Sequence, residues 1–122
     1  MRYLPLHFDL QGRDVLVVGG GEIARRKIEL LLRSAAHITV VAPEISDPVT
    51  TILQEKIHSL HAVNFNPEFL PGKCLIVAAT DDRGVNESVS REAKSLGIPV
   101  NVVDSPELCT VTFPAIIDRE PL

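Results

Sequence analysis

Three consecutive glycines, Gly19-Gly20-Gly21, follow a short apolar run and precede a segment with helical periodicity. Residues 14–18 read Asp-Val-Leu-Val-Val, which is typical of a buried parallel strand. Residues 22–33 repeat apolar side chains at steps of three and four among strong helix formers, which predicts an amphipathic helix. A strand, a glycine turn and a helix in this order predict the first unit of a dinucleotide-binding α/β fold.

The segment from Gly19 to Ala24 matches the G-x-G-x-x-A form of the dinucleotide fingerprint. In that form Gly19 makes the tight turn, Gly21 lets a pyrophosphate approach the backbone, and Ala24 lets the helix pack closely on the strand. The N-terminus of the helix adds free N–H donors and the positive end of a dipole. Glycines also serve simple turns that need positive φ, but the strand before and the helix after these three favour nucleotide binding.

The rest of the chain alternates between β-branched runs and helical segments. The expected strands are residues 37–42, 60–65, 74–79 and 98–103, and the expected helices are residues 47–58 and 85–96. Ser46 is expected to cap the first of these helices, and Gly97 is expected to end the second. Residues 110–117 are expected to form an edge or exit strand because they are rich in β-branched side chains.

Composition favours one covered sheet with a single core. The apolar content is 45%, tryptophan is absent and aromatic residues make up 4%, so helix-covered strands of Val, Ile, Leu and Ala are expected. Alternating strands and helices predict a parallel sheet with right-handed crossovers. We therefore expect residues 1–122 to form a single α/β domain with a Rossmann-type, doubly wound and mostly parallel sheet.

Charge, cysteine and histidine patterns argue against several other classes of protein. The formal net charge is −4 and the basic run at residues 25–27 is short, so binding to nucleic acid is not supported. Residues 1–10 contain no long apolar run and predict neither a signal peptide nor a membrane span. Cys74 and Cys109 have no metal or disulfide spacing, which favours a reducing cytoplasm. No metal site is predicted from the four scattered histidines, all expected at the surface or half-buried: His7, His37, His58 and His61.

The loop after the second expected strand carries a candidate adenosine contact. Glu44 lies about twenty residues after the glycines, where an acidic residue normally receives the ribose hydroxyls, although Pro43 intervenes. The pair can instead shape the adenosine pocket through backbone and ring contacts, and an exposed loop glutamate explains the position equally well. The absence of a basic residue there favours NAD over NADP.

Polar residues also follow the two later strands, at the edge where open α/β sheets bind ligands. Capping of the next helix is the favoured role for Asp81 or Asp82, with the backbone of Thr80 lining the cofactor. Asn101 fits a ligand contact or a satisfied buried amide. Asp104 follows an apolar run, and partial burial would make it a better base at neutral pH. The residues alone nevertheless favour an aspartate that opens a turn.

Several segments together carry a family resemblance. They are Leu4-Pro5, residues 17–21 with Ala24 and Lys27, residues 78–82 with Val85-Asn86, residues 101–104 and residues 114–119. In this order and spacing they resemble the N-terminal half of siroheme synthase, the precorrin-2 dehydrogenase and sirohydrochlorin ferrochelatase module. The resemblance covers nearly the whole chain and is far more specific than the glycine turn.

The resemblance implies NAD-dependent oxidation of the tetrapyrrole precorrin-2 to sirohydrochlorin, in some members with ferrous iron insertion, and a homodimer in the full-length form. It implies that Gly21, Glu22 and Ile23 hold the pyrophosphate, that the Pro43-Glu44 loop contacts the adenosine, and that Asp104 is catalytic. The cofactor-binding residues expected from all arguments are Gly19, Gly20, Gly21, Glu22, Ile23, Pro43, Glu44, Thr80, Asp81, Asn101 and Val102.

The family continues past this stretch into a glycine-containing loop and helices that build the dimer and much of the tetrapyrrole pocket, whereas the sequence ends at Leu122. We therefore expect these residues alone to keep NAD binding better than catalysis. The main alternative is a non-catalytic regulatory module that senses NAD or NADH and shifts a partner's conformation. A reductase acting on another small molecule is a further alternative.

Overall fold

Five parallel strands form one sheet at the centre of the protein, of which the computed structural model describes residues 2–114. The order across the sheet is β3-β2-β1-β4-β5. The strands are β1 (Asp14–Val18), β2 (His37–Val41), β3 (Ser59–His61), β4 (Leu75–Ala78) and β5 (Val100–Val102). The helices are α1 (Glu22–Arg33), α2 (Asp47–Ile52) and α3 (Arg83–Ser95), with short 3-10 helices η1 (Pro67–Phe69) and η2 (Pro106–Leu108).

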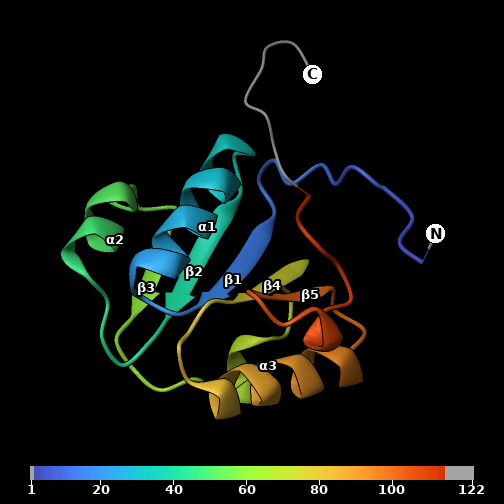
Figure 1. Cartoon of the computed structure of the whole chain (residues 1–122). Coiled ribbons are helices and arrows are strands. Elements are labelled where there is room, and N and C mark those ends of the chain that lie inside the picture. Colours follow the sequence, from blue (N-terminus) through green and yellow to red (C-terminus); the bar gives the residue numbers. More distant parts are fainter. Residues whose placement is uncertain (1, 115–122) are drawn as a thin grey trace.

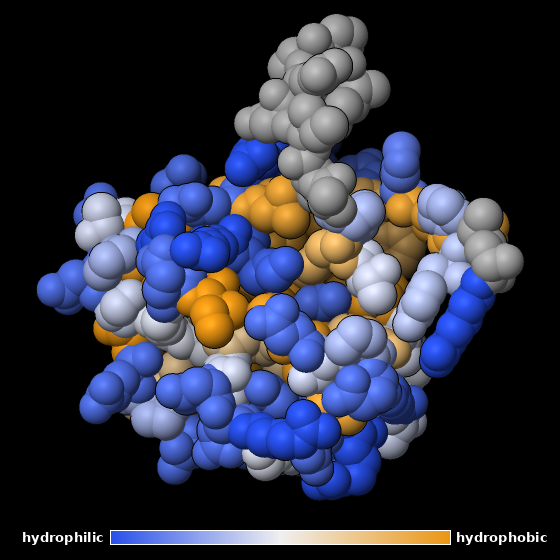
Figure 2. Space-filling model, viewed as in Figure 1, coloured by the Kyte–Doolittle hydropathy of each residue, from blue (hydrophilic) through white to orange (hydrophobic). Residues whose placement is uncertain are grey.

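Helices cover both faces of the sheet, with α1 and α3 on opposite sides (Figure 1). Val17 of β1 belongs to a core shared with Ile28 of α1, whereas its neighbour Leu16 belongs to a core shared with Val89 of α3. All four side chains are fully buried, as expected for strands covered on both faces. Figure 2 shows that hydrophilic side chains cover most of the outer face in this view, with apolar ones in separate small patches. The predicted Rossmann-type architecture is confirmed.

The direction of winding reverses beside β1. From β1 the chain winds outward through β2 and β3, returns to the other side of β1, and winds outward again through β4 and β5. In open α/β sheets a ligand binds at the carboxyl ends of the strands, next to such a reversal. The topology therefore points to the loops that follow β1 and β4.

Most predicted elements agree with the structure. The bounds of β1 and α1 are as predicted, and β2, β4, β5 and α3 lie within two residues of their predicted bounds. The hydroxyl of Ser46 accepts a hydrogen bond from the Val49 N–H at 3.4 Å, which confirms the predicted cap of α2. Gly97 has a φ of 69°, which confirms its predicted place just past the end of α3.

Two predicted elements were too long. The helix expected to reach His58 ends at Ile52, because its last three residues are β-branched and Leu53 leaves the helix to become buried. The strand expected over residues 60–65 covers Ser59–His61 only. It stops there because its partner β2 ends at Val41, directly opposite His61.

The exit strand expected over residues 110–117 is not found at residues 110–114, and residues 115–117 lie outside the described part of the chain. The backbone N–H groups of Thr110 and Val111 both donate to the carbonyl of Val100, at 2.8 and 3.2 Å. The Thr110 hydroxyl, in turn, accepts from the Val100 N–H at 2.9 Å. A side chain thus takes the place of a ladder carbonyl, and a regular strand pairing does not form.

The expectation that all histidines are exposed or half-buried was wrong for His58, which is 8% exposed. Its Nδ1 accepts a hydrogen bond from the Ile38 N–H at 3.1 Å, so the proton of the neutral ring lies on Nε2. Burial lowers the pKa of His58 below its ordinary value. The side chain thereby secures the first residues of β2 to the segment that precedes β3.

We expect His58 to make stability depend on pH. Because its pKa is lower in the folded than in the unfolded chain, the unfolded chain binds a proton first, and stability falls as the pH drops below about 6.5. The free energy of unfolding, measured by urea titration at several pH values between about 7.5 and 5.5, should fall with decreasing pH in the parent. This pH dependence should be smaller in His58→Gln. The exposed His7 gives the control: an unchanged slope in His58→Gln, or the same loss of slope in His7→Gln, would contradict this account.

Candidate nucleotide-binding site

The glycine turn after β1 packs directly against the loops after β2 and β4. Gly19 has a φ of 136°, and a Cβ atom built on it would overlap with the carbonyl of Ala79. A Cβ on Gly20 would overlap with the carbonyl of Glu44, and the Gly20 carbonyl accepts from the Ser46 N–H at 2.9 Å. The first two glycines therefore allow three loops to meet at the carboxyl edge of the sheet.

Gly21 differs from the two glycines before it. A Cβ atom built there would meet nothing within 4 Å, and its φ of −102° suits any residue. No side chain of the described residues caps α1 at this position, so the N–H groups of the first helical turn have no side-chain acceptor there. An open backbone position below uncapped N–H donors suits a pyrophosphate, and these residues therefore fit a bound dinucleotide.

The first turn of α1 carries one negative side chain, which is already neutralised. Arg25 binds both carboxylate oxygens of Glu22, at 2.7 and 2.6 Å, and also pairs with Glu29. The hydrogen bond from Arg25 lowers the pKa of Glu22 to about 2. Ile23 leaves 43% of its surface exposed, as several other large apolar side chains of this chain do, and this surface provides area that a nucleotide can cover.

The expected adenosine loop lies beside the glycine turn. Pro43 and Glu44 are both exposed, and the backbone of Glu44 touches Gly20. The Glu44 carboxylate makes no ion pair with any residue from 2 to 114. The position therefore suits either of the two contacts expected from the sequence, through the carboxylate or through the backbone and proline ring.

The loop after β4 separates the roles of its two aspartates. Asp82 caps α3, because its Oδ1 accepts from the Val85 N–H at 3.1 Å, which confirms the favoured interpretation for this residue. Asp81 is exposed and takes no part in the cap. The Thr80 hydroxyl donates to Asn86 Oδ1 at 2.7 Å, and the Thr80 carbonyl accepts from Asn86 Nδ2 at 3.0 Å. The loop against Gly19 is therefore held rigidly.

Asn101 in β5 is only half satisfied. Its Nδ2 donates to the Val111 carbonyl at 3.1 Å, but its Oδ1 is buried and accepts from no group among the described residues. The residue is 6% exposed. Because buried polar atoms are nearly always paired in proteins, the orphaned acceptor suits an N–H donor of a ligand once the side chain turns, since in this structure the oxygen exposes less than 1 Å². The alternative of a satisfied buried amide holds for one end of the side chain only.

Asp104 forms a turn and also presents an open carboxylate. Its φ is 62°, in the left-handed region, and the Ser105 N–H closes the turn on the Val102 carbonyl at 3.1 Å. Asp104 is exposed, so the partial burial expected after an apolar strand is not found, because the turn carries the residue out of the sheet. The turn and ligand roles that the sequence presented as alternatives are compatible at this position.

Cys109 braces this turn, which sequence reasoning missed. Its Sγ accepts from the Val102 N–H at 3.1 Å, and its single S–H hydrogen is shared between the carbonyls of Val102 and Ser105, which lie at 3.3 and 3.4 Å. Both ends of the turn that carries Asp104 are thus attached to one thiol. No local pattern predicts this arrangement, since it depends on η2 returning the chain to β5.

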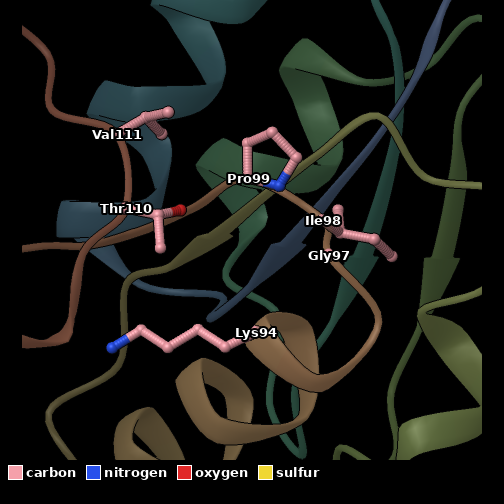
Figure 3. Close-up of a pocket in the computed structure, with 6 residues that line it drawn as sticks. All are labelled: Lys94, Gly97, Ile98, Pro99, Thr110 and Val111. Atoms are coloured by element: carbon pink, nitrogen blue, oxygen red, sulfur yellow. The ribbon is translucent and has the colours of Figure 1, made fainter.

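A hollow of about 250 Å³ opens beside Asp104. Its lining comes from α1, the end of β5 and the segment after η2, and it includes Lys27, Asn101, Asp104, Cys109, Thr112 and Phe113. A second hollow lies at the amino ends of the strands, where residues 97–99 lead into β5 (Figure 3). Lys94 is the charged residue of its lining, and it is remote from the glycine turn. The hollow beside Asp104 is therefore the one that belongs to the site.

Residues 2–114 contain neither a metal-binding cluster nor a membrane-spanning helix. No group of three His, Cys, Asp or Glu side chains is placed to hold a metal ion within that range. Within the same residues, no helix has the length and apolar character needed to cross a bilayer.

Comparisons with known proteins agree with this geometry. A family model described as putative NAD(P)-binding matches residues 6–115. The chain belongs to this family. It is 52% identical to siroheme synthase of Methylobacillus flagellatus, 50% to that of Nitrosomonas europaea and 45% to that of a Psychrobacter species, in each case over the whole chain. The resemblance drawn from the sequence motifs is thus confirmed.

The solved structure of SirC, a precorrin-2 dehydrogenase, matches with a TM-score of 0.79 and 34% identity over 93% of this chain. The matched region is only part of each relative. This family member spans 25–26% of the three siroheme synthases and 55% of the SirC chain. The match therefore concerns the nucleotide-binding fold and the residues at its carboxyl edge.

Two glycine variants should separate folding from binding. A methyl group on Gly21 points into open space, so Gly21→Ala should melt close to the parent while its NAD affinity falls about tenfold or more. Gly20→Ala should instead lose about 1–3 kcal/mol of stability, because its methyl overlaps with the Glu44 backbone. Thermal melts and calorimetric NAD titration measure both. Unchanged NAD affinity in Gly21→Ala would exclude the glycine turn as the pyrophosphate position.

Proposed function

We propose that this chain is the cofactor-binding domain of an NAD-dependent dehydrogenase that oxidises precorrin-2 to sirohydrochlorin in the siroheme or cobalamin route. The observation that carries the proposal is the braced, left-handed turn of Asp104 beside the hollow, at the same sheet edge as the open glycine turn. The similarity to siroheme synthases and to a precorrin-2 dehydrogenase supports this choice of substrate.

The residues proposed to hold NAD lie along the carboxyl edge of the sheet. The N–H groups at Gly21, Glu22 and Ile23 bind the pyrophosphate, and the Pro43-Glu44 loop contacts the adenosine. The loop after β2 carries the acidic residue Glu44 and no basic residue, which supports NAD over NADP. Further along the edge, the proposed contacts are the backbone of Gly19 and Gly20, Thr80 with Asp81, and Asn101 with Val102.

The proposed reaction removes two electrons and two protons from precorrin-2, which leave as one hydride and one proton. When bound, NAD supplies the acceptor for the hydride. The chain's own contribution is to position the substrate and to take the proton on a carboxylate oxygen of Asp104. The turn fixed by Cys109 holds that carboxylate in place before the substrate arrives.

Iron insertion, a cytoplasmic location and a homodimer also belong to the proposed function. Ferrous iron insertion would use Asp104 to accept pyrrole protons, although a lone carboxylate is a poor metal site. A cytoplasmic location suits the two free thiols, Cys74 and Cys109, which a reducing compartment preserves. The homodimer expected for the full-length protein stays a prediction.

Replacing Asp104 tests the proposal directly. Asparagine tolerates the left-handed backbone, so Asp104→Asn should keep the turn and the NAD affinity while removing the proton acceptor. In the full-length gene product, anaerobic oxidation of precorrin-2 by NAD, followed by absorbance, should slow by about 100-fold to 10,000-fold.

The regulatory alternative makes the opposite prediction. A module that only senses NAD or NADH needs no base. The parent and Asp104→Asn would then both bind NAD, and neither would oxidise precorrin-2. That result would overturn the proposed function. Full activity in Asp104→Asn would leave the dehydrogenase function standing but exclude Asp104 as its base. Turnover of generic carbonyl substrates, without turnover of precorrin-2, would favour a reductase that acts on another small molecule.

A further inference from the structure

Lys27 projects from α1 into the hollow beside Asp104 without an ion-pair partner among residues 2–114. Its Nζ lies 4.8 Å from the centre of the Phe113 ring. The neighbouring cations on the same helix are neutralised, because Arg25 pairs with Glu22 and Glu29 and Arg26 lies 3.5 Å from Glu22. The ammonium of Lys27 is therefore the one cation of this basic run that is available to a ligand.

The contact with Phe113 satisfies the ammonium only in part. An ammonium has three N–H donors, and a ring face receives it from one side. The chain carries 12 Lys and Arg against 16 Asp and Glu, so a cation without a carboxylate partner is not forced by an excess of positive charge. A hollow that retains such a group suits an anion.

A second polar group in the same hollow also points to a ligand. The buried Oδ1 of Asn101 has no donor among the described residues, although the residue lines the hollow with Lys27. A free cation, together with an acceptor that a small turn of the Asn101 side chain would expose beside the proposed cofactor contact, suits a ligand that has both carboxylates and N–H groups. A tetrapyrrole acid has both, with carboxylate arms around a ring that carries pyrrole nitrogens.

The size of the hollow indicates which part of the ligand it receives. Its volume of about 250 Å³ is below the roughly 300–1,000 Å³ of typical small-molecule pockets. It can therefore hold one arm and one edge of a tetrapyrrole, with the rest of the ring outside. The cofactor's phosphates have a separate position, at the N–H groups of Gly21 to Ile23, one helical turn before Lys27.

We propose that Lys27 is a specificity-determining residue that binds a carboxylate arm of the tetrapyrrole substrate and thereby places the ring edge beside Asp104. This inference rests on the proposed function and deepens it. It assigns a positive contact for an acidic substrate to a chain whose net charge of −4 would otherwise repel it.

Three variants test the inference in the full-length gene product. Lys27→Met keeps the apolar stem and removes the charge, so the KM for precorrin-2 should rise about tenfold while kcat and the KM for NAD change little. Lys27→Arg should recover most of the loss. Lys94→Met is the matched control, because Lys94 lines the hollow at the amino ends of the strands (Figure 3), and it should leave every constant unchanged.

Binding of sirohydrochlorin, followed by absorbance, gives a readout that does not depend on turnover. Its affinity should fall with added salt in the parent and lose most of that dependence in Lys27→Met. A KM for precorrin-2 and a salt dependence of sirohydrochlorin binding that stay as in the parent would overturn the inference for Lys27→Met. An effect of Lys27→Met on the KM for NAD alone would also overturn it. If the parent neither binds sirohydrochlorin nor oxidises precorrin-2, the proposed function fails together with the inference.

Discussion

Close contact between the glycine turn and two neighbouring loops is the constraint on which the site depends. The carbonyls of Ala79 and Glu44 occupy the space that a Cβ on Gly19 or Gly20 would need. Any larger residue would separate the loops after β1, β2 and β4, and the carboxyl edge would no longer present its groups together. Gly21 has no such neighbour, so the packing of the fold does not require a glycine there. A ligand that approaches the backbone at this position would require one.

The first helix serves both ends of the proposed site. Its N-terminus offers uncapped N–H groups, while Arg25 neutralises the carboxylate that would otherwise repel a pyrophosphate. One turn further along, Lys27 reaches the hollow that also contains Asn101 and Asp104. One rigid element thus relates the proposed cofactor position to the proposed substrate position, with β5 and its braced turn on the other side.

The sequence predicted those parts of the structure that depend on local pattern. The bounds of β1 and α1 follow from an apolar run, three glycines and helical periodicity, all within one stretch of chain. The length of β3 could not be predicted, because it is set by where β2 ends. Within the site, a general rule about strand ends located Asn101 and Asp104. The orphaned Asn101 oxygen and the contact between Lys27 and Phe113 depend on residues far apart in the chain, and periodicity carries no signal for them.

The most direct test of the central claim is a titration of the isotopically labelled chain with NAD, followed by backbone amide NMR. The account predicts shifts centred on the amides of residues 20–24, with further shifts at residues 43–44, 80–81 and 101–104. Those residues all lie at the carboxyl edge of one sheet. Absence of shifts at the glycine turn, or shifts confined to residues 94–99 at the opposite edge, would contradict it.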